Sequence, residues 1–306
     1  MKATRREFLG SGVQALGAAA LGMIARPARA ADAARITATS LGSGMMLLSG
    51  AGCNVVAVSG PDGSLLVDGG YARNSKALLA AAAHSTANGR VNTLINTHWH
   101  PAQTGSNEAI GRAGGLIIAH ERTREYLGRA IASVDYEGLY GPLPPMARPT
   151  KTTRTGGSLT FAGQPVEYGY LPAAHTDGDL YIHFPQANLV AAGGPVCADA
   201  WPLLDYRNGA WLGGLVKAHE KLVALVKPDT RIVPANGRMC TGAELAHHHE
   251  MYAAFHERMA AYLNKGWDSG DAIADHPLQA FEAQFGDPTA FIHGAFMSLN
   301  LAYSPD

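Results

Sequence analysis

The chain has 306 residues, of which 47% are hydrophobic and 16% are charged. This length and composition are typical of a compact globular protein with a full core, and they exclude a disordered or fibrous chain. The formal net charge is −1. The sequence therefore shows none of the excess of positive charge that is typical of a nucleic-acid-binding surface, and we expect no nucleic-acid partner.

The first 30 residues have the pattern of an export signal. A basic start with the pair Arg5-Arg6 is followed by an apolar run over 13–25 and a small-residue cleavage site at 28–30. The arginine pair resembles that of twin-arginine signals. The apolar run has about 13 residues, whereas a membrane-spanning helix needs roughly 20. We therefore predict a periplasmic or otherwise exported protein, not an integral membrane protein, that uses the twin-arginine export machinery and begins at Ala31 once mature.

Short strands and helices alternate in the first half of the remaining chain. We expect strands at 36–40, 44–48, 55–59, 64–67, 91–96 and 115–119, and helices at 75–83, 106–112 and 122–132. Asp62-Gly63 between two aliphatic runs is a strong hairpin signal. Residues 141–149 contain four prolines and a glycine, which predicts a loop that serves either as a lid or only as a connector.

In the second half, strands precede and then alternate with longer helices. We expect strands at 158–161, 166–170, 181–184, 189–192 and 231–233, helices at 212–226 and 245–263, and broken helix over 267–301. This order predicts an α/β sandwich of the αββα type, with two mixed sheets between helices. We expect one domain over 31–306, with the C-terminal stretch as a helical extension.

The strongest chemical signal is His98-Trp99-His100, directly after an expected buried strand. Two histidines at i and i+2 can turn toward one metal where the backbone curves out of a strand, and imidazole is a common zinc ligand. Such a pair is weak alone, because short histidine pairs are common on surfaces. It is accompanied by Asp68, at the end of an earlier strand, and by His175, which follows a later strand and lies 75 residues after His100.

The order of these residues along the chain resembles that of the ligand motifs in the metallo-β-lactamase superfamily. The pattern there is a strand-end Asp-x-Gly, an H-x-H-x-D-H motif, a histidine in H-T-x-G-D, a late Gly-Asp pair and a final histidine between glycines. The resemblance runs from about Gly50 to Gly237 and covers order, spacing and flanking strands. It implies the αββα fold and a metal-dependent hydrolase that acts on a small-molecule substrate.

The resemblance separates the ligand positions by metal. The first metal position falls on His98, His100 and His175, which are all present. The second metal position has lost its ligands, and the residues found there are Ala102, Gln103, Gly194 and Asn236. We therefore predict one zinc ion, or another divalent metal, rather than two. The alternative is a cluster of three histidines that is satisfied by hydrogen bonds in a degenerate pocket. Asp68 and Asp179 are expected to support the ligand histidines from behind.

Three histidines with one open position can activate a water molecule, which predicts a mononuclear zinc-dependent hydrolase. A carboxylate beside that water is missing from the motif, and the nearest in sequence are Asp177, Asp179 and Asp199. The alternative is a non-catalytic binding or scaffold protein that kept the fold and lost the activity. The fold does not identify the substrate, because β-lactams, thioesters, lactones and phosphodiesters are all hydrolysed within the superfamily.

Other residues give weaker signals. Cys53, Cys197 and Cys240 are odd in number, so at least one is free or pairs between chains; buried thiols are as good an interpretation as a disulfide. The run 247–249 and His256 lie on an expected helix, where solvation is the simpler interpretation than a second metal site.

Three aromatic residues lie near the predicted site in sequence. Trp99, Trp201 and Tyr206 could line the mouth of a pocket, although such aromatics are also ordinary core residues. The sequence leaves these two possibilities open.

Overall fold

The computed structural model describes residues 35–85 and 89–303, so the expected export signal lies outside the described residues. The described residues all belong to one compact unit, 33–306. Along the described chain, no helix combines the length and apolar character that a bilayer crossing requires.

The first sheet has seven strands in sequence order. They are β1 (Thr37–Gly42), β2 (Met45–Ser49), β3 (Val55–Gly60), β4 (Gly63–Val67), β5 (Val91–Ile95), β6 (Leu116–His120) and β7 (Lys151–Thr153). Strands β1 to β4 form an antiparallel meander, and β4 to β7 run parallel. The carboxyl ends of β4 and β5 therefore lie at the same edge of the sheet.

The second sheet has six strands in the order β13-β12-β11-β10-β9-β8. They are β8 (Gly156–Phe161), β9 (Gln164–Tyr170), β10 (Leu180–Phe184), β11 (Leu189–Gly193), β12 (Arg231–Pro234) and β13 (Cys240–Thr241). Only β11 and β12 are parallel, because helix α5 (Leu212–Leu225) carries the chain back between them.

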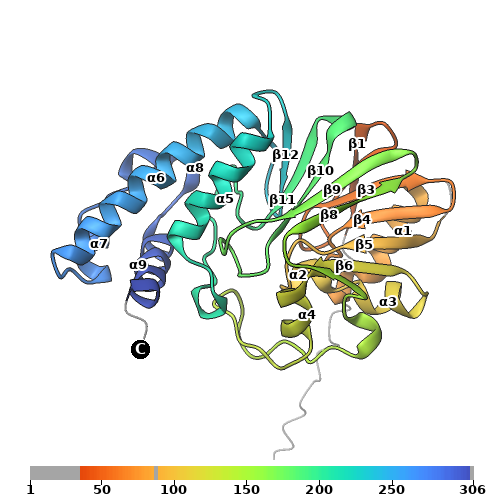
Figure 1. The fold of residues 1–306 in the computed structure, drawn as a ribbon, viewed down its shortest axis with the longest axis horizontal. Coiled ribbons are helices and arrows are strands. Elements are labelled where there is room, and N and C mark those ends of the chain that lie inside the picture. Colours follow the sequence, from red (N-terminus) through yellow and green to blue (C-terminus); the bar gives the residue numbers. More distant parts are fainter. Residues whose placement is uncertain (1–34, 86–88, 304–306) are drawn as a thin grey trace, which may run out of the picture. The chain divides into compact units, whose positions relative to one another are not determined.

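Apolar side chains from both sheets fill the space between them. Val56 and Leu65 of the first sheet belong to the same buried cluster as Ile182 and Val233 of the second. Burial on this shared face explains the apolar character of the inner strands, and it confirms the predicted pair of mixed sheets (Figure 1).

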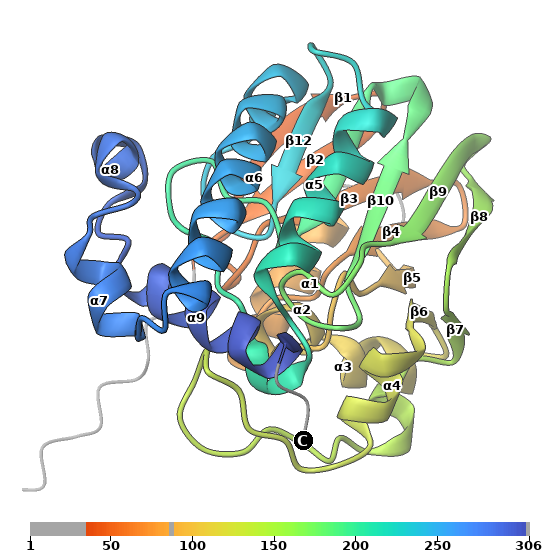
Figure 2. The same cartoon turned by 60° about the vertical axis from the view of Figure 1, so that its left-hand side comes forward.

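Helices cover the two outer faces of the sandwich (Figures 1 and 2). Leu78 of α1 (Ser75–Ser85) packs with Leu94 outside the first sheet. Leu215 of α5 and Tyr252 of α6 (Gly242–Asn264) pack with Val190 outside the second. The remaining helices are α2 (Pro101–Thr104), α3 (Asn107–Arg112), α4 (Glu121–Leu127), α7 (Ser269–Ala274), α8 (Glu282–Phe285) and α9 (Thr289–Tyr303).

The helix expected over 122–132 is shorter than predicted. It ends at Leu127, and Gly128 follows as the C-cap, with its N–H bonded to the carbonyls of the last turn. Glycine is a poor helix former, so the chain leaves the helix there. Residues 128–144 form a loop, hereafter the 128–144 loop. Backbone hydrogen bonds between Ile131 and Tyr140 close it.

The proline-rich segment 141–149 serves as a connector. It contains a short 3-10 turn at Pro145–Ala147, and Asn107 of α3 donates a hydrogen bond to the Ala147 carbonyl at 3.0 Å. None of its residues lines the cavity beside the three histidines. A lid function for this segment is therefore not supported.

Candidate metal centre

The strand ends bring His98, His100 and His175 together. The first two lie in the turn between β5 and α2, and the third lies in the loop between β9 and β10. One nitrogen of each ring lies within 4.8 Å of the corresponding nitrogens of the other two rings. This is the one group of potential metal ligands found among the described residues, and all three side chains are buried.

His98 is held from behind by Thr97 and Asp68. The Thr97 hydroxyl donates to Asp68 Oδ2 at 2.8 Å, and the Thr97 N–H donates to Asp68 Oδ1 at 2.8 Å. The hydroxyl oxygen lies 2.9 Å from His98 Nδ1. Since the hydroxyl proton is already used, Nδ1 carries the proton of this contact and donates it. The Nε2 atom of His98 is left without a proton.

His175 is fixed at both its ring and its backbone. Nδ1 lies 2.8 Å from the carbonyl oxygen of Leu203, which can only accept, so Nδ1 is the protonated nitrogen. Asp179 accepts hydrogen bonds from the His175 N–H at 2.7 Å and from the Thr176 hydroxyl at 2.7 Å. Nε2 is therefore the nitrogen of His175 available to a metal.

His100 is oriented by Asp205, a residue that the sequence motifs did not identify. Nε2 of His100 lies 3.1 Å from Asp205 Oδ2, and this carboxylate also accepts hydrogen bonds from Ser133 and Asn208. Burial raises the pKa of Asp205, but hydrogen bonds, first among them that from His100, outweigh it and hold the pKa below its usual value. An ionised carboxylate accepts only, so the proton of His100 is on Nε2 and Nδ1 is bare.

The three bare nitrogens face one another. His100 Nδ1 lies 3.1 Å from His175 Nε2. Burial lowers the pKa of His100 and lowers that of His98 well below its usual value, so these two rings are neutral at neutral pH. Two unprotonated nitrogens at this separation repel unless a proton or a metal cation lies between them. The donor set therefore fits a divalent ion held by three imidazoles, each oriented by a hydrogen bond at its other nitrogen.

Burial also acts on the two supporting carboxyls. It raises the pKa of Asp68 to about 7, against hydrogen bonds from Thr97 that lower it. It raises the pKa of Asp179 as well. Neither carboxyl has an oxygen in the group of potential ligands, so both act through the backbone and hydroxyl groups that they hold.

A cavity of about 290 Å³ opens beside the histidines. The positions that correspond to the second metal all line it: Ala102, Gln103, Gly194 and Asn236. At Gly194 the space is already taken, because a Cβ atom added there would lie 2.2 Å from Cδ2 of His175. This position can carry no side chain while the ring keeps its place.

Of the three carboxylates nearest to the site in sequence, only Asp179 contacts a ligand histidine, at the His175 N–H. Asp177 forms an ion pair with Arg122 at 3.4 Å, and Asp199 lies against Gly237. The carboxylates that approach a histidine ring are Asp205 and Asp135, both at His100. Neither belongs to a sequence motif, and only the folded contact between distant segments shows their role.

The three aromatic residues expected near the pocket mouth lie in different surroundings. Trp99 is fully buried in a cluster with Tyr126 and Leu127, so it does not line the pocket mouth. Apolar side chains of α4 and the 128–144 loop cover Trp99. Trp201 lines the cavity, and Tyr206 lines a neighbouring apolar pocket.

The other candidate residues lie outside the centre or do not form a metal group. Cys53, Cys197 and Cys240 are free thiols, of which Cys197 lines the cavity. In the run 247–249, His248 is buried against Phe285. Since these histidines face different surroundings, they do not form a second metal-binding group among the described residues.

Comparisons with known proteins identify the family and the fold. A family model described as the metallo-β-lactamase superfamily matches residues 48–293. A metallo-β-lactamase from Pontibacter korlensis is 20% identical, with a TM-score of 0.56, and the match covers 72% of this chain and 99% of that chain. DIM-1 metallo-β-lactamase is 16% identical, with a TM-score of 0.57, over 72% of this chain and 97% of that chain.

A third similar structure is larger. The stereoselective inverting sec-alkylsulfatase Pisa1 from Pseudomonas sp. is 14% identical, with a TM-score of 0.67, and the match covers 86% of this chain and 50% of that chain. At these identities the solved structures show a shared fold and leave the reaction open.

Proposed function

Because the chain belongs to the metallo-β-lactamase superfamily, we propose that it is an exported mononuclear metallohydrolase in which His98, His100 and His175 hold one zinc or other divalent ion. The observation that carries the proposal is the arrangement of the three rings. In each ring, the nitrogen that points away from the centre is hydrogen-bonded, and the nitrogen that faces the other two rings carries no proton. A zinc ion bound there would supply a Lewis acid and would lower the pKa of a water molecule in the open position to about 7.

The residues of the chain supply orientation and the walls of the site. Thr97, Asp205 and the Leu203 carbonyl fix the tautomers of the ligand histidines. Gln103 and Asn236 bring neutral amides to the cavity wall, where they can hydrogen-bond a substrate but cannot accept a proton at neutral pH. The cavity of about 290 Å³ fits a small-molecule substrate or the reacting end of a larger one.

Metal analysis followed by an activity screen tests this proposal. Protein purified without added metal should contain about one divalent ion per chain, and the metal-loaded protein should hydrolyse at least one of a β-lactam, a thioester, a lactone and a phosphodiester. No bound ion after zinc is supplied would contradict the proposal and favour a non-catalytic binding protein. One ion without turnover on a broad ester panel would retain the metal centre but reject the hydrolase.

The export part of the proposal rests on the sequence of the first 30 residues. Mass spectrometry of the protein recovered from the periplasm should show a mature chain that begins at Ala31. An intact Met1 start in that fraction would contradict processing at this site.

A further inference from the structure

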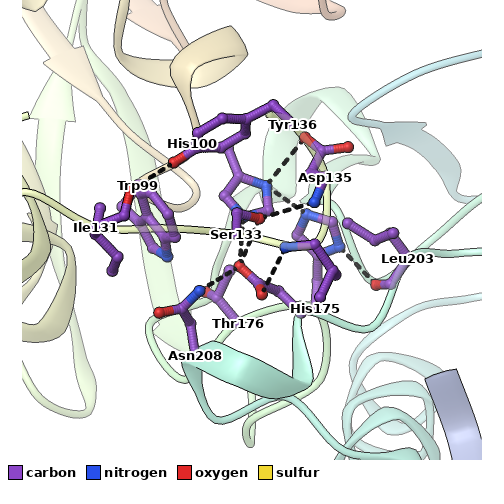
Figure 3. A network of polar contacts seen from close by, with 12 residues as sticks. Trp99, His100, Ile131, Ser133, Asp135, Tyr136, His175, Thr176, Leu203 and Asn208 are labelled. Carbon is purple, nitrogen blue, oxygen red and sulfur yellow. Dashed lines mark hydrogen bonds and ion pairs between the residues drawn. The ribbon is translucent and has the colours of Figure 1, made fainter. Parts of the chain in front are cut away.

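The 128–144 loop brings one carboxylate to the histidine centre. Asp135 Oδ2 lies 3.7 Å from Nδ1 of His100, the bare nitrogen of that ring. Among the described residues that line the cavity, Asp135 is the only one with a carboxylate. Its side chain is 42% exposed and lies beside His100 (Figure 3).

The position of this loop is coupled to the ligand His100. Ser133 donates a hydrogen bond to Asp205 Oδ2 at 2.9 Å, and the Val134 N–H approaches Asp205 Oδ1 at 3.4 Å. The Asp135 N–H in turn donates to the Ser133 hydroxyl at 3.0 Å. One buried carboxylate therefore orients His100 and also fixes the backbone that presents Asp135.

The distances place Asp135 just outside the ligand set. Ligand atoms on a tetrahedral zinc with bonds near 2.0–2.1 Å lie roughly 3.3 Å from one another. Asp135 is farther than this from His100 and is not part of the group whose atoms lie within 4.8 Å of one another. A carboxylate at this range can reach a molecule bound to the ion more easily than the ion itself.

We propose that Asp135 accepts a hydrogen bond from the water or substrate group that occupies the open side of the three-histidine centre. This inference rests on the proposed metal site. The positions that correspond to the second metal cannot supply such a group, because Ala102 and Gly194 have no polar side-chain atom and Gln103 and Asn236 are neutral. Among the described residues that line the cavity, Asp135 is then the one carboxylate that can contact the bound molecule.

An anion titration tests the placement without requiring a substrate. The full chain is loaded with cobalt(II), whose visible spectrum reports the ligand geometry, and azide is added as the probe. A carboxylate beside the open position repels azide, so Asp135→Asn should bind azide about tenfold more tightly than the unmodified protein. The same variant should keep one ion per chain and the three-histidine spectrum.

Two further variants make the result specific. Glu137→Gln removes an exposed acid of the same loop that does not line the cavity, and it should leave azide affinity unchanged. Asp135→Glu restores the charge, and its azide affinity should return toward that of the unmodified protein. An effect of equal size in Glu137→Gln would mean that general surface charge is responsible, which would contradict the proposal.

The possible failures are distinguishable. Unchanged azide affinity in Asp135→Asn would overturn the inference, because the carboxylate would not face the open position. Loss of the ion from Asp135→Asn would also overturn it and would make Asp135 a direct ligand. Failure of the unmodified protein to take up cobalt or zinc would instead refute the metal centre, and this inference with it.

Discussion

The two halves of the cavity differ in how their residues are supported. On the side of the three histidines, the ring nitrogen that points away from the centre has a hydrogen-bond partner in each ring. Two of these partners, Thr97 and Asp205, make further hydrogen bonds. On the other side, the positions of a second metal offer no ionisable group, and His175 occupies the space that a side chain at Gly194 would need. One of the four second-metal positions is therefore blocked by a ligand of the first metal position.

The backbone at the altered positions still serves the fold. The carbonyl oxygen of Gln103 accepts hydrogen bonds from the Gly69 N–H at 2.7 Å and from Asn96 Nδ2 at 2.9 Å. Directly before Asn236 and Gly194, the Ala235 N–H donates to the Gly193 carbonyl at 2.9 Å. Side-chain chemistry can thus be lost at these positions while the loops that frame the three histidines stay in place.

The largest expected effect comes from removing a ligand on the intact side. His175→Ala leaves two imidazoles, which rarely hold zinc firmly, so zinc affinity should fall by about 1000-fold or more. Isothermal titration measures this loss, with His249→Ala as the control that should bind normally. Undiminished binding in His175→Ala would place the ion elsewhere, for example at the run 247–249.

A change at Gly194 tests whether the two halves exclude each other. In Gly194→Ala the new Cβ would overlap the His175 ring, so the ring must move and zinc affinity should fall by about 100-fold. Gly294→Ala is the matched control, because the nearest atom to its added Cβ lies at 4.0 Å. Normal zinc binding by Gly194→Ala would show that the His175 ring can accommodate a side chain at position 194. The two halves of the cavity would then not exclude each other.

The support of His100 predicts an intermediate effect. Asp205→Asn keeps the shape but can donate toward Nε2, which favours the wrong tautomer of His100, so zinc affinity should fall by about 10- to 100-fold. Competition with a zinc chelator gives the affinity. Asp199→Asn should leave it unchanged, and an equal loss in both variants would remove the special role of Asp205.

Restoring ligands on the altered side should have the smallest effect. The double variant Ala102→Asp with Gln103→His supplies two donors, but Gly194 and Asn236 remain, so any second ion should bind at least about 100-fold more weakly than the first. A zinc titration of the double variant resolves the two affinities. Two sites of equal zinc affinity would show that the absence of these two side chains alone accounts for the loss of the second metal site.

Sequence patterns were sufficient for the fold and for the three histidines. The apolar runs predicted both sheets, and the resemblance to the metallo-β-lactamase superfamily implied that His98, His100 and His175 lie together. Sequence patterns were insufficient for Asp135 and Asp205, since both lie in irregular segments where no periodicity or motif applies. Their roles depend on contacts with His100 across 35 and 105 positions of chain, which only the folded structure supplies.

Local errors had physical causes as well. The helix predicted to run to 132 stops at Leu127 because Gly128 ends it, and this frees the loop that carries Asp135. Helix α6 begins at Gly242, before the expected residue 245, because Thr241 and Glu244 form a capping box. Short elements such as β7, β13 and α2 have too few residues to show a periodic pattern.

The number of divalent ions bound by the unmodified chain tests the central claim most directly. Isothermal titration of the metal-free protein with zinc should show one tight site per chain, because three bare imidazole nitrogens converge on one point and the other half of the cavity offers no comparable ligand. Two tight sites would contradict the account, and would mean that Cys197 or Asp199 supplies the ligands that the altered positions lack.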